Sequence, residues 1–173
     1  MLKKFTFVVL VGISLLHATE INSIADIRKV YTQIHNTLSS MYLKRIDVSY
    51  QSSEGGEIKV YSNPKAHLRM IKKELFGEMG KYIHESYYAD DKLFFVFEAD
   101  IRYNAPMYSN MFDSKQNEVI EDRYYFIHGK MIRWLHGKKQ IDPKSQDFEK
   151  KAQEILQTAQ NIKQETNLNK ARI

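Results

Sequence analysis

The chain has 173 residues, of which 43% are hydrophobic, so it is long enough for one domain with a substantial core and too short for two. It contains no cysteine, which excludes a disulfide framework, a thiolate metal site and the lipidated cysteine of a lipoprotein. The net charge is +5, but the basic residues form short clusters such as Lys72-Lys73 and Lys138-Lys139, so we expect no nucleic-acid partner.

The first 18 residues have the pattern of a secretory signal. Lys3 and Lys4 precede an apolar run over 5–16, and Ala18 offers a small residue for cleavage. The run is shorter than the ~20 residues that span a bilayer. We therefore predict a signal peptide over 1–18 and a mature chain that is not stably inserted in the membrane and lies in the periplasm or outside the cell. The alternative is an uncleaved N-terminal anchor.

Residues 21–42 have the pattern of an amphipathic helix. Ser23 followed by Asp26 resembles a capping box with aspartate in place of the usual glutamate or glutamine. Hydrophobic side chains then recur at three- and four-residue steps, at Ile24, Ile27, Tyr31, Ile34 and Leu38. We expect this stripe to pack on a sheet.

From residue 44 the hydrophobic period changes to two, which predicts β-strands. Turn residues divide this region into about seven strands, over 44–50, 57–61, 68–76, 81–88, 92–103, 118–127 and 131–135. Short turns join most of them, so consecutive strands should pair antiparallel in a meander over 44–138. Gly129 and Gly137, each in a His-Gly-Lys turn, should have positive φ.

The strand predicted at 92–103 is the longest and should lie at the centre of the sheet. It is apolar on both faces at its start and half-polar at its end. We expect the face that begins at Leu93 to meet the helices, and the face with Glu98 and Arg102 to be open. The connection that follows, 104–116, has a length that is often associated with function.

A second amphipathic helix is predicted over 142–166. Asp142-Pro143 provides an N-cap and a first helical residue. One apolar stripe follows, at Phe148, Ala152, Ile155, Ala159 and Ile162. The expected fold class is α+β, a single domain over 19–173. In it an antiparallel meander of about seven strands carries an N-terminal helix (19–43) and the C-terminal helix packed on one face.

Several segments resemble a group of small exported bacterial proteins, namely 54–61, 76–81, 87–98 and 121–135. The resemblance extends over the mature chain in the order of elements, and it is specific only in the hairpins that combine aromatic residues with Gly-Lys. These hairpins also look superficially like MORN repeats, although Asp90-Asp91 stands where such a repeat has glycine. No activity is assigned to the group, so the resemblance implies no catalytic residue.

The sequence contains no motif for catalysis, for a metal or for a cofactor. Four carboxylates on predicted strands are candidates for a hydrolytic pair, Glu85, Glu98, Asp100 and Glu121. Cross-strand ion pairs with arginine explain the same pattern without catalysis. The histidines form no ligand pair, and Met107 and Met111 are better explained by packing than by a copper site.

The predicted sheet has more aromatic side chains than one face can bury, so some should be exposed beside arginines. The predicted ligand- or partner-binding residues are Tyr88, Arg102, Tyr103, Tyr108, Arg123, Tyr125, Arg133 and Trp134. We therefore expect an exported, non-enzymatic binding or interaction module without a cofactor, whose open aromatic and charged sheet face holds a peptide, a glycan or a protein partner. The alternatives are a periplasmic carrier of an apolar ligand between sheet and helices, and a hydrolase that uses sheet carboxylates.

Overall fold

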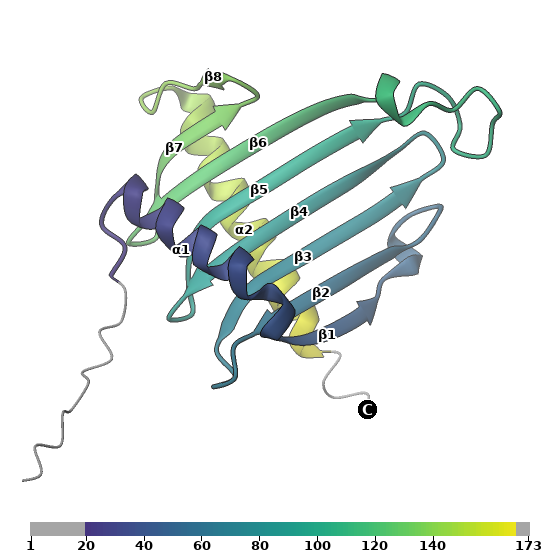
Figure 1. Ribbon diagram of the computed structural model, residues 1–173. Helices are drawn as coiled ribbons and strands as arrows, with labels where there is room; N and C mark the ends of the chain where they lie inside the picture. The colour runs from purple at the N-terminus through teal and green to yellow at the C-terminus, as the bar shows by residue number, and fades with distance from the viewer. Residues whose placement is uncertain (1–19, 169–173) are drawn as a thin grey trace, which may run out of the picture.

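The computed structural model describes residues 20–168, so the signal peptide predicted at 1–18 lies outside the described residues. Within 20–168 the chain forms one eight-stranded antiparallel sheet, in which strands pair in sequence order, and it has an α-helix at each end of this range (Figure 1). The predicted α+β class and antiparallel meander are confirmed. Neither helix in this range is long and apolar enough to cross a membrane.

The strands follow the predicted order, but the first and the last strand of the sheet differ from the prediction. They are β1 (Tyr42–Asp47), β2 (Gly56–Ser62), β3 (Leu68–Gly77), β4 (Gly80–Ala89), β5 (Lys92–Arg102), β6 (Glu118–Ile127), β7 (Lys130–His136) and β8 (Lys139–Gln140). The sequence did not predict β8. The strand expected over 44–50 stops at Asp47, because a 3₁₀ turn over Ser49–Gln51 follows.

The hairpin turns explain why neighbouring strands pair so regularly. Asp90 and Asp91, between β4 and β5, have φ values of 49° and 60°. Two consecutive positive φ values are typical of the type I′ turn, whose twist matches that of the strands it joins. Gly129 and Gly137 have φ values of 76° and 56°, as predicted from the His-Gly-Lys turns.

The first helix, α1 (Ile24–Thr37), is shorter than the 21–42 that the sequence predicts. A 3₁₀ turn over Leu38–Ser40 follows it and leads directly into β1. The predicted cap is confirmed, because the Ser23 hydroxyl accepts a hydrogen bond from the Asp26 backbone N–H at 3.1 Å.

The second helix, α2 (Gln146–Leu168), begins four residues later than predicted. Its N-cap is Ser145, whose hydroxyl accepts a hydrogen bond from the Phe148 N–H at 3.2 Å. The Asp142 carboxylate instead accepts from the Lys144 N–H at 2.9 Å, in the turn before the helix.

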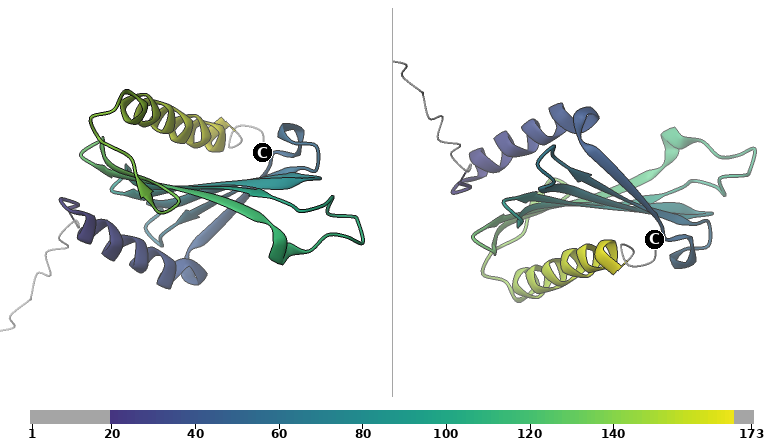
Figure 2. Two further views of the ribbon diagram at one scale, coloured as in Figure 1. Left: turned by 90° about the horizontal axis from the view of Figure 1, so that it is seen from above. Right: turned by 90° about the horizontal axis from the view of Figure 1, so that it is seen from below.

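The two helices of the described range lie on opposite faces of the sheet (Figure 2), which corrects our expectation that both pack on one face. Ile27 of α1 packs in the same cluster as Phe95, whereas Ile155 of α2 packs with Val96. Adjacent strand residues point to opposite faces. Because the start of β5 is apolar on both faces, each face needs its own cover. We name the two surfaces the α1 face, with Phe95, and the α2 face, with Val96.

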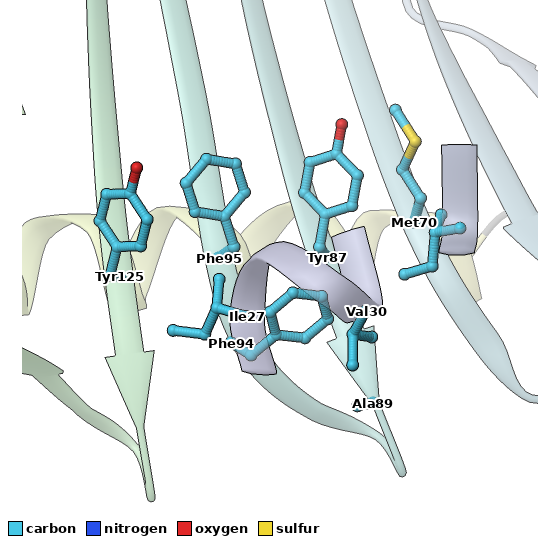
Figure 3. Packing of buried hydrophobic residues seen from close by; sticks show 9 residues of the cluster. Ile27, Val30, Met70, Tyr87, Ala89, Phe94, Phe95 and Tyr125 are labelled. Atoms are coloured by element: carbon cyan, nitrogen blue, oxygen red, sulfur yellow. The ribbon is translucent and has the colours of Figure 1, made fainter. Parts of the chain in front are cut away.

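On the α1 face, α1 covers one end of the strands. Figure 3 shows a row of side chains from β3 to β6 beneath Ile27 and Val30 of the helix, namely Met70, Tyr87, Phe95 and Tyr125. These four residues are directly opposite one another in the strand register. Toward the other end of the same face, no helix lies over the sheet (Figure 1).

Candidate functional site

The residues predicted to bind a partner do not form a single surface. They separate into three groups: Arg123, Tyr125 and Arg133 on the α1 face, Tyr88 and Trp134 on the α2 face, and Arg102, Tyr103 and Tyr108 near the β5–β6 connection. The sequence could not separate them, because the face of a strand residue depends on register and on bulges such as the one between Tyr125 and Phe126.

The group near the β5–β6 connection is engaged in local contacts. Tyr108 is 71% exposed, and its hydroxyl donates a hydrogen bond to the Glu54 carboxylate at 2.6 Å. The Tyr103 ring packs edge-on against Phe112, with their centroids 5.2 Å apart. Arg102 forms long ion pairs, at 3.7 and 3.9 Å, with carboxylates of its own strand and of β6. These contacts fix the loop on the end of the sheet.

A groove of about 560 Å³ runs between α1 and the sheet, and it is the best candidate for a binding site. Its floor is aromatic and comes from neighbouring strands, with Phe95 and Phe97 on β5 and Tyr125 on β6. Its wall comes from α1, with Arg28 and Tyr31. A largely apolar lining with a few charged groups is typical of ligand sites.

The strand register explains this floor. Phe95 lies opposite Tyr125, and Phe97 lies opposite Arg123, so all four side chains are on the α1 face. The rings of Phe95 and Tyr125 are 5.0 Å apart, and Tyr31 of α1 meets Phe95 edge-on at 5.5 Å. Phe95 and Tyr125 are buried, whereas Phe97 is half-buried and available to a ligand.

Arginines border the groove. Arg123 forms an ion pair with Glu121 on its own strand and donates to the Gly137 carbonyl at 3.3 Å. The guanidinium carbon of Arg133 lies 5.7 Å from the centre of the Tyr125 ring, in a cation–π contact. The groove therefore combines aromatic surface with positive charge.

A partly buried hydrogen-bonded chain connects α1 to the sheet beside the groove. The Tyr87 hydroxyl donates to the Glu85 carboxylate at 2.6 Å and lies 2.9 Å from His35 Nε2. A phenol has only one hydrogen to donate, so Nε2 of His35 must carry the hydrogen of the second bond. Burial and the neighbouring Glu85 raise the pKa of Tyr87, which therefore stays protonated.

The α2 face contains a second polar network, centred on Glu98. The Tyr82 hydroxyl donates to Oε1 of Glu98 at 2.6 Å, the Tyr124 hydroxyl donates to Oε2 at 3.0 Å, and His84 Nδ1 lies 3.0 Å from Oε1. Burial by itself raises the pKa of Glu98, but these hydrogen bonds outweigh burial and hold the pKa below its ordinary value. We expected Glu98 on an open face, and this is wrong, because its side chain is only 15% exposed.

Ser86 extends this network in an order that resembles a Ser-His-carboxylate relay. Its hydroxyl lies 2.7 Å from Nε2 of His84, whose Nδ1 faces Glu98. Both Ser86 and His84 have no exposed surface, however. A substrate cannot reach them, so we interpret the network as structural.

Tyr88 and Trp134, the predicted site residues on the α2 face, serve the same structural purpose. The Trp134 indole N–H donates a hydrogen bond to the Asp122 carboxylate at 2.6 Å. The same carboxylate oxygen lies 3.0 Å from His136 Nδ1. Tyr88 is only 3% exposed and packs in a cluster with Ile162 of α2. Burial raises the pKa of Tyr88 to about 12.

The carboxylates predicted for a hydrolytic pair are divided between the two faces. Glu85 and Glu121 are on the α1 face, whereas Glu98 and Asp100 are on the α2 face. Glu85 forms an ion pair with Lys72 at 3.4 Å, and Glu121 pairs with Arg123. Glu98 accepts its three hydrogen bonds, and Asp100 is exposed. The four therefore do not meet as one catalytic set.

We expect acid to destabilise the protein. Like Glu98, two glutamates on the α1 face have pKa values below about 4.5, the ordinary value of glutamate. Hydrogen bonds from Arg45 and Lys59 lower the pKa of Glu57. Burial raises the pKa of Glu74, but the neighbouring Lys59 and Lys72 outweigh burial and lower it. A folded-state pKa below the unfolded one stabilises the fold above the unfolded pKa, and this contribution is lost as pH falls through the folded pKa. The urea midpoint should therefore fall steadily below about pH 4.5. A midpoint that stays constant from pH 7 to pH 3 would contradict this.

No group of three or more acidic or histidine side chains within residues 20–168 is arranged to hold a metal ion. A scan against models of protein families found no match, and searches of curated proteins and of solved structures found no similar chain. The resemblance to exported bacterial proteins therefore stays a prediction, and the case for a function depends on the groove itself.

Proposed function

We propose that the chain is an exported, non-enzymatic binding module and that its binding site is the groove between α1 and the sheet. The observation that supports this most directly is the groove's aromatic floor, which α1 leaves partly open. Phe97 is half-buried there beside Arg123. The helix crosses the strands over one end of the sheet and leaves the other end of this face without a helix (Figure 1). An apolar surface left open next to charged groups is typical of interaction sites.

This location favours an accessible partner over an enclosed cargo. The apolar stripe of α1 is used in packing, since Ile27, Val30 and Ile34 are each 1% exposed. On the other face, Phe148, Ile155 and Ile162 of α2 are buried in the same way. The helices thus fill the space that a carrier would keep for an apolar ligand, while the groove opens at the side of α1. A peptide, a protein segment or a glycan outside the cytoplasm is the proposed class of partner.

Site-specific photo-cross-linking in the native host tests the proposal. A benzoylphenylalanine at Thr32, which is exposed and lines the groove, should capture a partner. The same group at Lys29, which is exposed on α1 but does not line the groove, is the matched control. We expect an adduct from position 32 that is absent from position 29, and we expect Phe97→Ser to reduce its yield about tenfold, the effect of losing one buried aromatic contact.

Two outcomes would contradict the groove as the site. One is the same set of adducts from Thr32 and Lys29, which would indicate non-specific contact. The other is an adduct from Thr32 whose yield does not change in the Phe97→Ser variant, because a partner in the groove must contact that ring.

A further inference from the structure

We infer that the chain pairs with a second copy of itself through the outer edge of β1, so that two sheets join into one continuous antiparallel sheet. This edge is a different surface from the groove, and the pairing does not depend on the proposed function. Three features of β1 support it: an uncovered backbone edge, charged side chains that are held by their own chain, and an order of residues that is complementary to itself about Ile46.

The backbone of β1 has one side that no neighbouring strand uses. β1 is the first strand in the sheet order and pairs only with β2 (Figure 1). The Val48 N–H donates to the Gly56 carbonyl at 3.0 Å, so it points toward β2. Backbone groups of successive residues point to opposite sides of a strand, so those of Leu43, Arg45 and Asp47 point away from β2. In the described part of the chain, no backbone group pairs with them.

The opposite edge of the sheet is partly covered. β8 pairs with Leu135 and His136 of β7, and the Ile141 N–H donates to the Trp134 carbonyl at 3.0 Å. β1 has no such cover among the described residues, and an unpaired strand edge readily accepts another strand. The partner that fits this edge is therefore an extended backbone with N–H and C=O groups of its own to exchange.

The charged side chains of β1 do not block this edge. Charges on an edge strand normally oppose pairing, but here each is held by a group of its own chain. Lys44 Nζ donates to the backbone of α2 at 3.3 Å, and Arg45 pairs with Glu57 at 2.7 Å. The Asp47 carboxylate accepts a hydrogen bond at 2.8 Å from the backbone of the turn after β1. β1 contains no proline, and its register with β2 is regular.

The order of residues in and around β1 favours a second copy over an unrelated strand. Arg45 and Asp47 lie on the same face, on either side of Ile46. When two antiparallel copies of β1 are centred on Ile46, Arg45 of each copy lies opposite Asp47 of the other, which gives two pairs of opposite charge. The same symmetry brings Tyr42 of each copy toward Tyr50 of the other. Each copy thus offers what the other needs, as a two-fold interface requires.

The pairing also covers side chains that water now surrounds. Tyr42 and Tyr50 are 64% and 77% exposed, and Leu43 is 42% exposed. The guanidinium group of Arg45 has further N–H donors, so it can keep Glu57 while it binds a second carboxylate. Burial of aromatic surface, cross-strand ion pairs and backbone hydrogen bonds then act together at one edge.

Hydrogen exchange of single amides tests the backbone pairing in the unmodified chain, labelled with ¹⁵N. We expect the N–H groups of Arg45 and Asp47 to exchange at least about tenfold more slowly at a concentration where sedimentation gives twice the monomer mass than in the monomer. The Ile46 N–H points toward β2 and is the internal control, so it should exchange slowly in both states. Rapid exchange at Arg45 and Asp47 at the highest concentration would overturn the inference, and so would a monomer mass.

Charge-reversed variants test the register. Asp47→Arg places arginines opposite one another in both pairs, and Arg45→Asp places aspartates opposite one another. Each variant alone should therefore dissociate at least about tenfold more readily than the unmodified chain. An equimolar mixture of the two variants should form a heterodimer, because every arginine then faces an aspartate.

Lys130→Asp is the matched control, since it reverses an exposed charge on β7, near the opposite edge, and should leave the mass unchanged. A mixture of the β1 variants that stays monomeric would overturn the inference, and so would a dimer that only Lys130→Asp disrupts. If the β1 variants do not fold, the exchange of the unmodified chain decides. Cross-linking from Thr32 reports on the groove alone, so a failure of the β1 pairing and a failure of the groove are distinguishable.

Discussion

Replacing Glu98 with glutamine should lower the free energy of unfolding by about 3 kcal/mol. The Glu98 carboxylate accepts hydrogen bonds from Tyr82, His84 and Tyr124 in a site where its side chain is only 15% exposed. Glutamine keeps the shape but offers one acceptor oxygen and adds an NH₂ group that must face a donor. At least one of the three surrounding donors therefore loses its partner. Urea unfolding at pH 7 measures the difference.

Asp100→Asn is the matched control for this variant. Asp100 is on the same strand and the same face as Glu98, two residues further on, but its side chain is 53% exposed. Its ion pair with Arg102, at 3.7 Å, is exposed as well. We expect a change within about 0.5 kcal/mol. Equal effects of the two substitutions would show that the Glu98 network does not stabilise the fold.

Replacing Ile155 with alanine should lower the free energy of unfolding by about 3 kcal/mol. Ile155 is 1% exposed and packs with Val96 and Phe126 of the sheet. Alanine favours helix more than isoleucine does, so the loss comes from the cavity and from lost burial, not from helix propensity. Gln153→Ala, an exposed position on the same helix, should change the value by less than about 0.5 kcal/mol.

Substitutions at Ile155 and at Ile27 also test whether the two helices cover opposite faces of the sheet. Ile27 of α1 and Ile155 of α2 pack on opposite faces and share no cluster. The milder variants Ile27→Val and Ile155→Val should therefore be additive in the double mutant, to within about 0.5 kcal/mol. If both helices lay on one face, as the sequence suggested, a shared core could couple the two positions, and clear non-additivity would contradict the arrangement.

Two residues that line the candidate site, Arg123 and Tyr125, are among those that the sequence pattern singled out. Arg133, predicted with them, packs over the Tyr125 ring but does not line the groove. The pattern missed Arg28 and Phe97, because one looked like the solvent side of a helix and the other like core. The alternation of Phe97 with Phe95 is visible in the sequence, but the partial exposure of Phe97 is not, because it depends on where α1 crosses the strands.

The Glu98 network was missed for a different reason. Tyr82, His84 and Ser86 alternate on one face of a predicted strand, and this much is visible in the sequence. The partner Glu98 becomes visible only when the register places it opposite His84. A shift of one residue would turn Glu98 to the other face, where α1 lies. In the actual register, the burial of Glu98 depends on α2, which comes from a distant part of the chain.

The sequence by itself determined the local structure: the period of two, the Asp90-Asp91 turn and the Ser23 cap specify strands, a hairpin and a helix through contacts between residues close in the chain. Consecutive pairing followed from the short turns. Only the tertiary structure decided which face each helix covers, because one apolar stripe fits either side of a sheet that is apolar on both. That choice buries Glu98 under α2 and leaves the arginine-bordered groove open beside α1.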